Sequence, residues 1–439
     1  MNKGFGDDPD SWRIAVSAFY LKNTGVYFPS RFPGYPFPEY LNSVLINYGW
    51  FATNTLTMII TLISIYAFGK ILLELNVKNK GILFLTYAFV PLIWINSTNT
   101  MDYMWAMCFI MLSICTLLES RYVLSAALFG LAIGSRSTSL LLLPAILFYI
   151  YGQYSHKKIK RFIGEYVVVV GIVSTIVYTP LFLKYGFTFI TYYPTNYTLI
   201  EHIERFGYNI YDSIGLISIS YILFYVVKFK STFSNEIHSE NKQVIFYLIA
   251  IVPFLLLYAK VPYDAGYLIP TVPFILLFLE KIGNDKHILI LSLLLVSNSI
   301  FAIGDIDATN KEEINIKIIG EGLVLDNAND RVTNIEITNE IIDFDMKNSV
   351  FIVRSYLPYI EMTYLANSAN GTISHSVIDG YYYDESKNRY YVYRLSENQI
   401  REYVLKNYTI YYLENCILED DLDYDLRMYE AKLLEITNE

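Results

Sequence analysis

Three carboxylates lie within four positions near the start of the chain: Asp7, Asp8 and Asp10. Their mutual repulsion raises the proton affinity of at least one of them unless a cation or an arginine lies close. Such a cluster can act as a general base or hold a divalent cation. The structural alternative is an N-cap, in which Asp8 or Asp10 accepts hydrogen bonds from the first amides of the helical pattern 14–21. Capping needs one carboxylate, so it explains neither the other two nor the aromatic, proline-rich loop 29–36.

A second group suited to chemistry is Arg136, which lies between two short apolar segments, 122–134 and 137–152. A guanidinium in such a place is costly unless it meets an anion, and its planar fork matches the oxygens of a phosphate. The structural alternatives are snorkelling to the membrane interface and pairing with Asp102. Arg136 is therefore a candidate for phosphate binding.

The composition indicates that lipid surrounds much of the chain. Hydrophobic residues make up 54% of the 439 residues and charged ones 17%, with a mean hydropathy of +0.34. This apolar content exceeds what a soluble core of this size needs, so the excess must face lipid. Between residues 50 and 303 the sequence is mostly a series of apolar runs, many close to the roughly 20 residues that cross a bilayer.

We predict about ten membrane spans from these runs. The segments are 50–73, 81–97, 102–118, 122–134, 137–152, 162–183, 209–227, 244–259, 267–282 and 287–303. Lysines and arginines of alternate loops then fall on one side, which the positive-inside rule assigns to the cytoplasm. The segments that lie outside are 1–47, 185–208, the loop around 260–266 and the C-terminal region.

Residues 305–439 are predicted to form a small, acidic α/β domain outside the membrane. Strand-like runs at 349–353 and 409–413 alternate with helix-like runs at 357–366 and 397–406. The region holds 26 Asp and Glu residues against 12 Lys and Arg, which argues against nucleic acid as a partner. Its tyrosine-rich runs offer aromatic surface suited to carbohydrate, although a core or edge strand explains them equally well.

Several motifs, by their order and common external placement, resemble the GT-C superfamily of membrane glycosyltransferases. An acidic pair in the first external loop precedes a short helix and a chain of re-crossing spans, and further motifs are 96–103, 130–136 and 260–270. The likeness is greatest to the protein O-mannosyltransferase and aminoarabinose-transferase branches. It implies that residues 1–304 form a transmembrane catalytic domain. Members of the superfamily ordinarily have a span before the acidic loop, so we expect a further span upstream of the residues in this chain.

The resemblance implies inverting transfer of a sugar from a polyprenyl-phosphate donor to a glycan, lipid or protein acceptor. The reaction would take place on the extracytoplasmic face of the plasma membrane. Asp8 is the first candidate for the base that takes the acceptor hydroxyl proton, and Asp7 is the second. Asp10 would cap the helix or bind a cation.

The same mechanism needs positive charge to stabilise the departing phosphate. Arg136 is the first candidate for this role, and Arg31 and Lys260 rank second. No cofactor is indicated beyond a divalent cation at the acidic cluster, because the five histidines and three cysteines form no ligand spacing.

Further candidate substrate contacts lie near external span ends. Asp102 and Asp264 are predicted there, where a carboxylate is hydrated cheaply, so a structural role competes with substrate binding. Tyr263 and Tyr267 can stack on a sugar or a polyprenyl chain, although interfacial anchoring is the commoner role of tyrosine at a membrane boundary.

Two other function classes compete with a transferase. A transporter or flippase of a lipid-linked or anionic solute would use Arg136 and the aspartates along a path, but such proteins usually show internal repeats and mid-membrane charges. No repeat links the halves 50–152 and 162–303. A membrane-anchored receptor or scaffold would leave the acidic loop unexplained.

Overall fold

The computed structural model describes two compact units. It covers residues 3–153, 156–190, 198–238, 241–310, 313–367, 380–413 and 431–434, with the backbone alone at 156–158, 212, 237–238, 303–310 and 313–318. We call the first unit the terminal unit; it comprises Met1–Phe32, Glu39–Asn54 and Asn329–Glu439. The second, which we call the helical unit, comprises Pro33–Pro38 and Thr55–Ala328.

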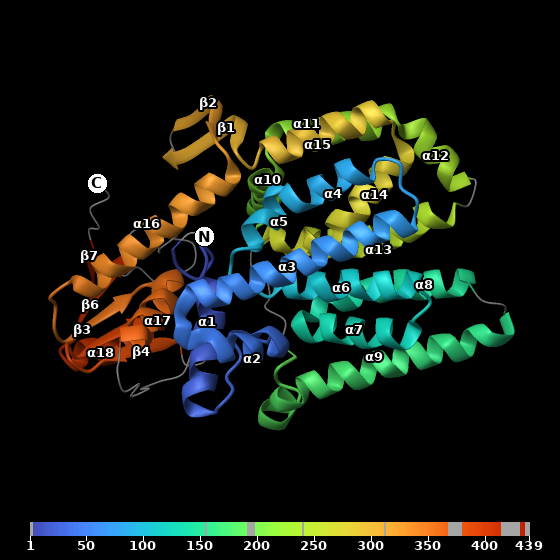
Figure 1. The fold of residues 1–439 in the computed structure, drawn as a ribbon. Coiled ribbons are helices and arrows are strands. Elements are labelled where there is room, and N and C mark those ends of the chain that lie inside the picture. The colour runs from blue at the N-terminus through green and yellow to red at the C-terminus, as the bar shows by residue number, and fades with distance from the viewer. Residues whose placement is uncertain are drawn as a thin grey trace. The chain divides into compact units, whose positions relative to one another are not determined.

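Helices form most of the helical unit (Figure 1). In chain order they are α3 (Gly49–Glu74), α4 (Lys80–Phe89), α5 (Pro91–Asn96), α6 (Tyr103–Leu118), α7 (Tyr122–Ser135), η2 (Ser137–Leu142), α8 (Leu143–Gln153), α9 (His156–Tyr185), α10 (Leu199–Ile214), α11 (Leu216–Lys228), α12 (Lys230–His238), α13 (Lys242–Lys260), η3 (Ala265–Thr271), α14 (Val272–Ile282) and α15 (Asp285–Ser297). Two antiparallel strands follow, β1 (Phe301–Asn310) and β2 (Glu313–Glu321).

Four helical stretches among the described residues are long and apolar enough to cross a membrane: Pro36–Glu74, Ile159–Tyr185, Lys242–Lys260 and Ala265–Ile282. A fifth is obtained if the bent pair α10 and α11 counts as one span, and shorter apolar helices accompany them. This architecture fits a multi-pass membrane protein, as the composition predicts. The number of ten spans stays a prediction.

The span predicted at 81–97 is wrong as a single helix. The chain forms α4 and then α5, which are separated at Val90, whose ψ of 134° is extended. The reason is Pro91, because proline disfavours helical geometry in the residue before it. The apolar run is therefore continuous while the helix is not.

Two other predicted spans differ from the helices in the structure. The span 209–227 is interrupted at Gly215, where α10 ends and α11 begins at an angle of 97°. The span 287–303 is too long, since α15 ends at Ser297 and the apolar run continues into strand β1, which begins at Phe301. The apolar run continues across both points although the helix ends there, because hydropathy measures side-chain polarity and not the path of the backbone.

Small residues bring α7 against α9, and α6, α7 and α9 lie side by side (Figure 1). A Cβ atom at Gly130 would lie 2.7 Å from Val173 Cβ, and one at Gly134 would lie 2.6 Å from Val177 Cγ1. Glycines one turn apart thus permit the close approach that small residues allow between membrane helices. This packing fixes the end of α7, directly before Arg136.

The terminal unit combines helices from both ends of the chain with a five-stranded sheet. Its elements are α1 (Pro9–Thr24), α2 (Pro36–Leu45), η1 (Ile46–Tyr48), α16 (Leu323–Asp343), β3 (Ser349–Ile352), η4 (Arg354–Tyr356), α17 (Leu357–Asn367), β4 (Tyr381–Asp384), β5 (Arg389–Val392), α18 (Glu397–Leu405), β6 (Thr409–Leu413) and β7 (Lys432–Leu434). The strand order is β4-β5-β3-β6-β7, with β3 parallel to both neighbours and β4 antiparallel to β5.

These elements agree with the predicted strands and helices of the C-terminal region. β3 and β6 match the runs at 349–353 and 409–413, and α17 and α18 match those at 357–366 and 397–406. The parallel centre explains why β3 is buried throughout, since helices can cover both of its faces. The division of the chain into domains at residue 304 stays a prediction.

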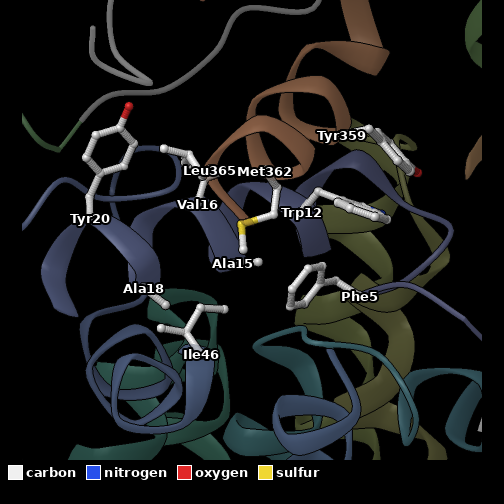
Figure 2. Packing of buried hydrophobic residues seen from close by; sticks show 10 residues of the cluster. All are labelled: Phe5, Trp12, Ala15, Val16, Ala18, Tyr20, Ile46, Tyr359, Met362 and Leu365. Carbon is white, nitrogen blue, oxygen red and sulfur yellow. The ribbon is translucent and has the colours of Figure 1, made fainter. Parts of the chain in front are cut away.

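The core of the terminal unit joins α1 to α17. Trp12 stacks on Tyr359 with 4.5 Å between ring centroids, and Met362 and Leu365 lie in the same cluster as Phe5 (Figure 2). The small residues of α1 are fully buried in this contact, so the helix packs closely. α1 is therefore held by side chains that lie more than 300 positions further along the sequence.

Candidate functional site

The N-terminal carboxylates surround the start of α1. Asp8 is the N-cap, and its Oδ1 accepts a hydrogen bond from the backbone N–H of Asp10 at 2.7 Å. Pro9 follows at the first helical position, where a missing N–H costs nothing. The cap expected at Asp8 or Asp10 is thus Asp8, and the cap bond sets the orientation of that carboxylate.

Asp10 pairs with two arginines. Its carboxylate lies 3.1 Å from Arg13 Nη1 and also forms an ion pair with Arg31. The guanidinium carbon of Arg13 lies 5.6 Å from the centre of the Tyr393 ring. An arginine thus does lie close to the clustered carboxylates, which is the condition under which their mutual repulsion is offset. Arg31, a second-rank candidate for the donor phosphate, belongs to this acidic cluster.

Asp7 is approached by residues of α16 and α17 that the sequence did not single out. Tyr359 donates a hydrogen bond from its hydroxyl to the backbone oxygen of Asp7, and Asn334 Nδ2 donates to the same oxygen at 3.4 Å. Arg331, which is 1% exposed, interacts electrostatically with Asp7. No motif or spacing linked these residues, because the contact spans more than 300 positions.

A buried carboxylate, Glu361, lies in the contact between α1 and α17. Glu361 is 3% exposed, and Tyr20 donates a hydrogen bond from its hydroxyl to Glu361 Oε1 at 2.8 Å. Burial raises the pKa of Glu361 to about 8, because a charged carboxylate is poorly solvated there. The hydrogen bond from Tyr20 opposes that shift.

The described residues contain no group of three or more His, Cys, Asp or Glu side chains arranged to hold a metal ion. Asp7, Asp8 and Asp10 therefore do not form a ready ligand set, although they are close in sequence. The cations beside Asp7 and Asp10 in the structure are arginines.

The second candidate site is Arg136, in the helical unit. It follows α7 in an extended conformation and is 3% exposed, and its Nη1 lies 2.6 Å from Oδ2 of Asp102, which is fully buried. Of the structural alternatives, pairing with Asp102 is confirmed and snorkelling is wrong. A buried pair of this kind is weak evidence for stability, because desolvation of both charges offsets much of their attraction.

Three tyrosine rings surround the Arg136 guanidinium. Its carbon lies 3.9 Å from the ring centre of Tyr103, 4.8 Å from that of Tyr267 and 5.6 Å from that of Tyr35. Such cation–π contacts stabilise a desolvated arginine. We call Arg136, Asp102 and these three tyrosines the arginine cluster.

Asp264 holds Tyr103, one of the three tyrosines of the arginine cluster, in place. It accepts a hydrogen bond from the Tyr103 hydroxyl and caps η3 by accepting from the Gly266 backbone N–H at 2.6 Å. The structure thus brings together four predicted site residues: Arg136, Asp102, Asp264 and Tyr267. The sequence did not single out Tyr35 or Tyr103 for this role.

Buried polar atoms of the arginine cluster lack hydrogen-bond partners among the described residues. They are Arg136 Nε and Asp102 Oδ1, and the neighbouring Trp105 Nε1 shares this property. Buried polar groups are normally paired, and an unpaired one costs about 1–3 kcal/mol. Such atoms are what a polar or anionic ligand would satisfy.

The two remaining predicted residues, Lys260 and Tyr263, come shortly before Asp264 in the sequence. Lys260 ends α13 and is exposed, and Tyr263 follows in the loop with 39% of its surface exposed. Asn209 Nδ2 of α10 donates to the backbone oxygen of Pro262 at 2.7 Å, which supports this loop.

The predicted residues therefore fall into two groups. Asp7, Asp8, Asp10 and Arg31 belong to the terminal unit, whereas Arg136, Asp102, Asp264, Tyr267, Tyr263 and Lys260 belong to the helical unit.

Comparison with known proteins gives one family. Residues 33–314, well over half of the chain, match the model of the EpsG family. No curated protein and no solved structure matches the chain. The matched residues include the arginine cluster but not the three aspartates.

Proposed function

Because the chain belongs to the EpsG family, we propose that it is a membrane glycosyltransferase that uses a polyprenyl-phosphate sugar as donor. The family suggests a membrane glycosyltransferase- or polymerase-like function. Donor, acceptor and mechanism are our proposal. The acceptor is a glycan, lipid or protein, and a growing glycan is the acceptor that a polymerase would need.

The arginine cluster is the observation that carries this proposal. Arg136 is buried among tyrosines, has one carboxylate partner and keeps an unpaired Nε. A phosphate would supply both the missing acceptor and a compensating charge, and a guanidinium binds phosphate through paired N–H groups. Asp102 would hold the guanidinium in orientation while the phosphate binds.

The reaction needs a base as well as an anion site. The base takes the proton of the acceptor hydroxyl while its oxygen bonds to the anomeric carbon. The bond from that carbon to the phosphate oxygen breaks, and the bonding electrons leave with the polyprenyl phosphate. Attack from the face opposite the phosphate inverts the anomeric centre. Asp8 is our first candidate for the base and Asp7 the second.

Arg136 stabilises the charge that grows on the departing phosphate. Tyr267 and Tyr103 offer ring faces beside the guanidinium, and Tyr263 offers a partly exposed ring in the loop between α13 and η3. Aromatic rings suit both sugar faces and isoprenoid chains. Lys260 is retained as a second-rank phosphate contact.

We place the reaction on the extracytoplasmic face of the plasma membrane. This follows from the distribution of lysines and arginines among the loops, which assigns the N-terminal segment and the C-terminal region to that side. The half-buried tyrosines of β4 and the exposed Tyr393, directly after β5, are our candidate surface for the acceptor.

The test uses membranes that contain the full chain and a radiolabelled polyprenyl-phosphate sugar. Wild type should transfer label to an acceptor, and Asp8→Asn and Arg136→Ala should lose transfer. Arg161→Ala and Asp285→Asn are matched controls, since both side chains are exposed on the helical unit. Transfer that survives both site substitutions would exclude the assigned residues. Protein-dependent movement of the donor across vesicles, with no transfer from any donor, would instead support a transporter or flippase.

A further inference from the structure

The acidic loop 4–8 is held by side chains from α16 and α17. Two donors, Tyr359 and Asn334, converge on one backbone oxygen, that of Asp7. Trp12 Nε1 binds the next carbonyl back, that of Gly6, at 2.9 Å. Consecutive carbonyls of the loop are thus bound by side chains, which restricts the backbone that carries Asp7 and Asp8.

The donors are themselves held in place. Tyr359 is 1% exposed and its ring stacks on Trp12, so its hydroxyl has little freedom to move. Asn334 accepts a hydrogen bond on its Oδ1 from the Tyr356 hydroxyl at 3.2 Å, which directs its Nδ2 toward the loop. A Cβ atom at Gly4 would lie only 2.9 Å from Ile335 Cδ1, so the loop also packs closely against α16.

A buried charge completes this support. Arg331 lies one helical turn before Asn334 on α16, on the same face. Burial lowers the pKa of Arg331, and the negative charge of Asp7 opposes that change. A buried arginine is kept at a cost, which a neighbouring carboxylate offsets.

We infer that Arg331, Asn334 and Tyr359 are positioning residues of the acidic loop, so that residues 329–367 are a required part of the acidic site. These residues act through Asp7 and Asp8, whose role as a base rests on the proposed function. The inference assigns this segment a task other than acceptor binding. It also places the support outside the residues that match the family, 33–314.

Hydrogen–deuterium exchange of the full chain tests the positioning directly, whatever the protein catalyses. Tyr359→Phe removes the hydroxyl and keeps the ring that stacks on Trp12. Exchange of the amides in 6–10 should rise about three- to tenfold, as expected for the loss of one hydrogen bond. Tyr408→Phe is the matched control, because that hydroxyl binds Asn388 Oδ1 at 2.8 Å elsewhere in the terminal unit. Unchanged exchange in both Tyr359→Phe and Asn334→Ala would overturn the inference.

Kinetics separate positioning from a merely structural role. Tyr359→Phe and Asn334→Ala should lower kcat several-fold and leave the KM for the donor unchanged. Arg331→Met removes the buried positive charge beside Asp7 and should lower kcat in the same way. Arg331→Lys should restore much of that kcat. If wild type transfers no sugar, the proposed function fails while the exchange result still decides this inference.

Discussion

The two units differ in how they treat buried charge. In the terminal unit Asp8 caps a helix and Asp10 pairs with two arginines, so the clustered carboxylates have partners within the protein. In the helical unit Arg136 and Asp102 pair with each other, yet each keeps a buried atom without a hydrogen bond. An unpaired polar atom costs more free energy where it is buried away from water. The difference favours our proposal that the arginine cluster binds an anionic ligand, whereas the carboxylates of the terminal unit are held by partners within the protein.

The residues that match the family also separate the arginine cluster from the acidic cluster. Residues 33–314 contain the whole arginine cluster, while Asp7, Asp8 and the residues that support them lie outside. The anion site is thus the part of the proposed mechanism that the family match covers. The predictions that follow test whether the two sites are as different as their contacts indicate.

The largest effect is expected for Arg136. Arg136→Ala should lower sugar transfer by about 10²–10³-fold, the loss typical of removing a group that stabilises developing negative charge. Arg136→Lys should recover little, because an ammonium does not reproduce the fork geometry. Initial rates in membranes measure this, with Arg161→Ala expected to stay within about twofold of wild type. Equal losses in Arg136→Ala and Arg161→Ala would mean that the cluster has no special role.

Asp102 should matter most for stability. Asp102→Ala leaves the buried guanidinium without its partner, which should cost about 3–5 kcal/mol. The double variant Asp102→Leu with Arg136→Met should regain much of that loss, since two apolar side chains need no charge compensation. Thermal unfolding of the purified protein in detergent measures both. An additive double variant would show that the pair is not coupled.

Glu361 should make the stability of the terminal unit depend on pH. Burial raises its pKa in the folded protein to about 8, above the ordinary pKa of 4.5 that a glutamate has in an unfolded chain. The folded state therefore binds the proton more tightly, and stability should fall as pH rises from about 4.5 through 8. Glu361→Gln keeps a hydrogen-bond acceptor for Tyr20 and removes this dependence. The free energy of unfolding should change between pH 5.5 and pH 8.5 in both proteins. That change should be smaller in the variant than in wild type by roughly 1–3 kcal/mol.

The smallest effect is expected for Asp10. Asp10→Asn removes the ion pairs with Arg13 and Arg31 but leaves the cap at Asp8 and the contacts of Asp7. A loss of about 1 kcal/mol or less is expected for such partly exposed pairs. Transfer should fall far less than in Asp8→Asn. A loss as large as that of Asp102→Ala would show that the acidic cluster is as strongly coupled as the buried pair.

Local patterns of the sequence predicted much of the fold. The apolar runs predicted the helices of a membrane protein, and β3, β6, α17 and α18 lie where strand and helix patterns indicate. The breaks at Pro91 and Gly215 were missed because hydropathy continues through them. The N-cap was predicted as one of two residues, since a capping carboxylate acts within three positions of itself.

Pairing between distant segments was decided by the tertiary structure alone. The sequence by itself determined that Arg136 is costly in an apolar setting and that three carboxylates repel one another. It left open whether Arg136 meets Asp102 and could not indicate that Tyr35, Tyr103 and Tyr267 surround it. It also gave no link between Asp7 and Tyr359. Charge and hydropathy are local properties of a chain, whereas the partners of a buried group depend on which segments pack together.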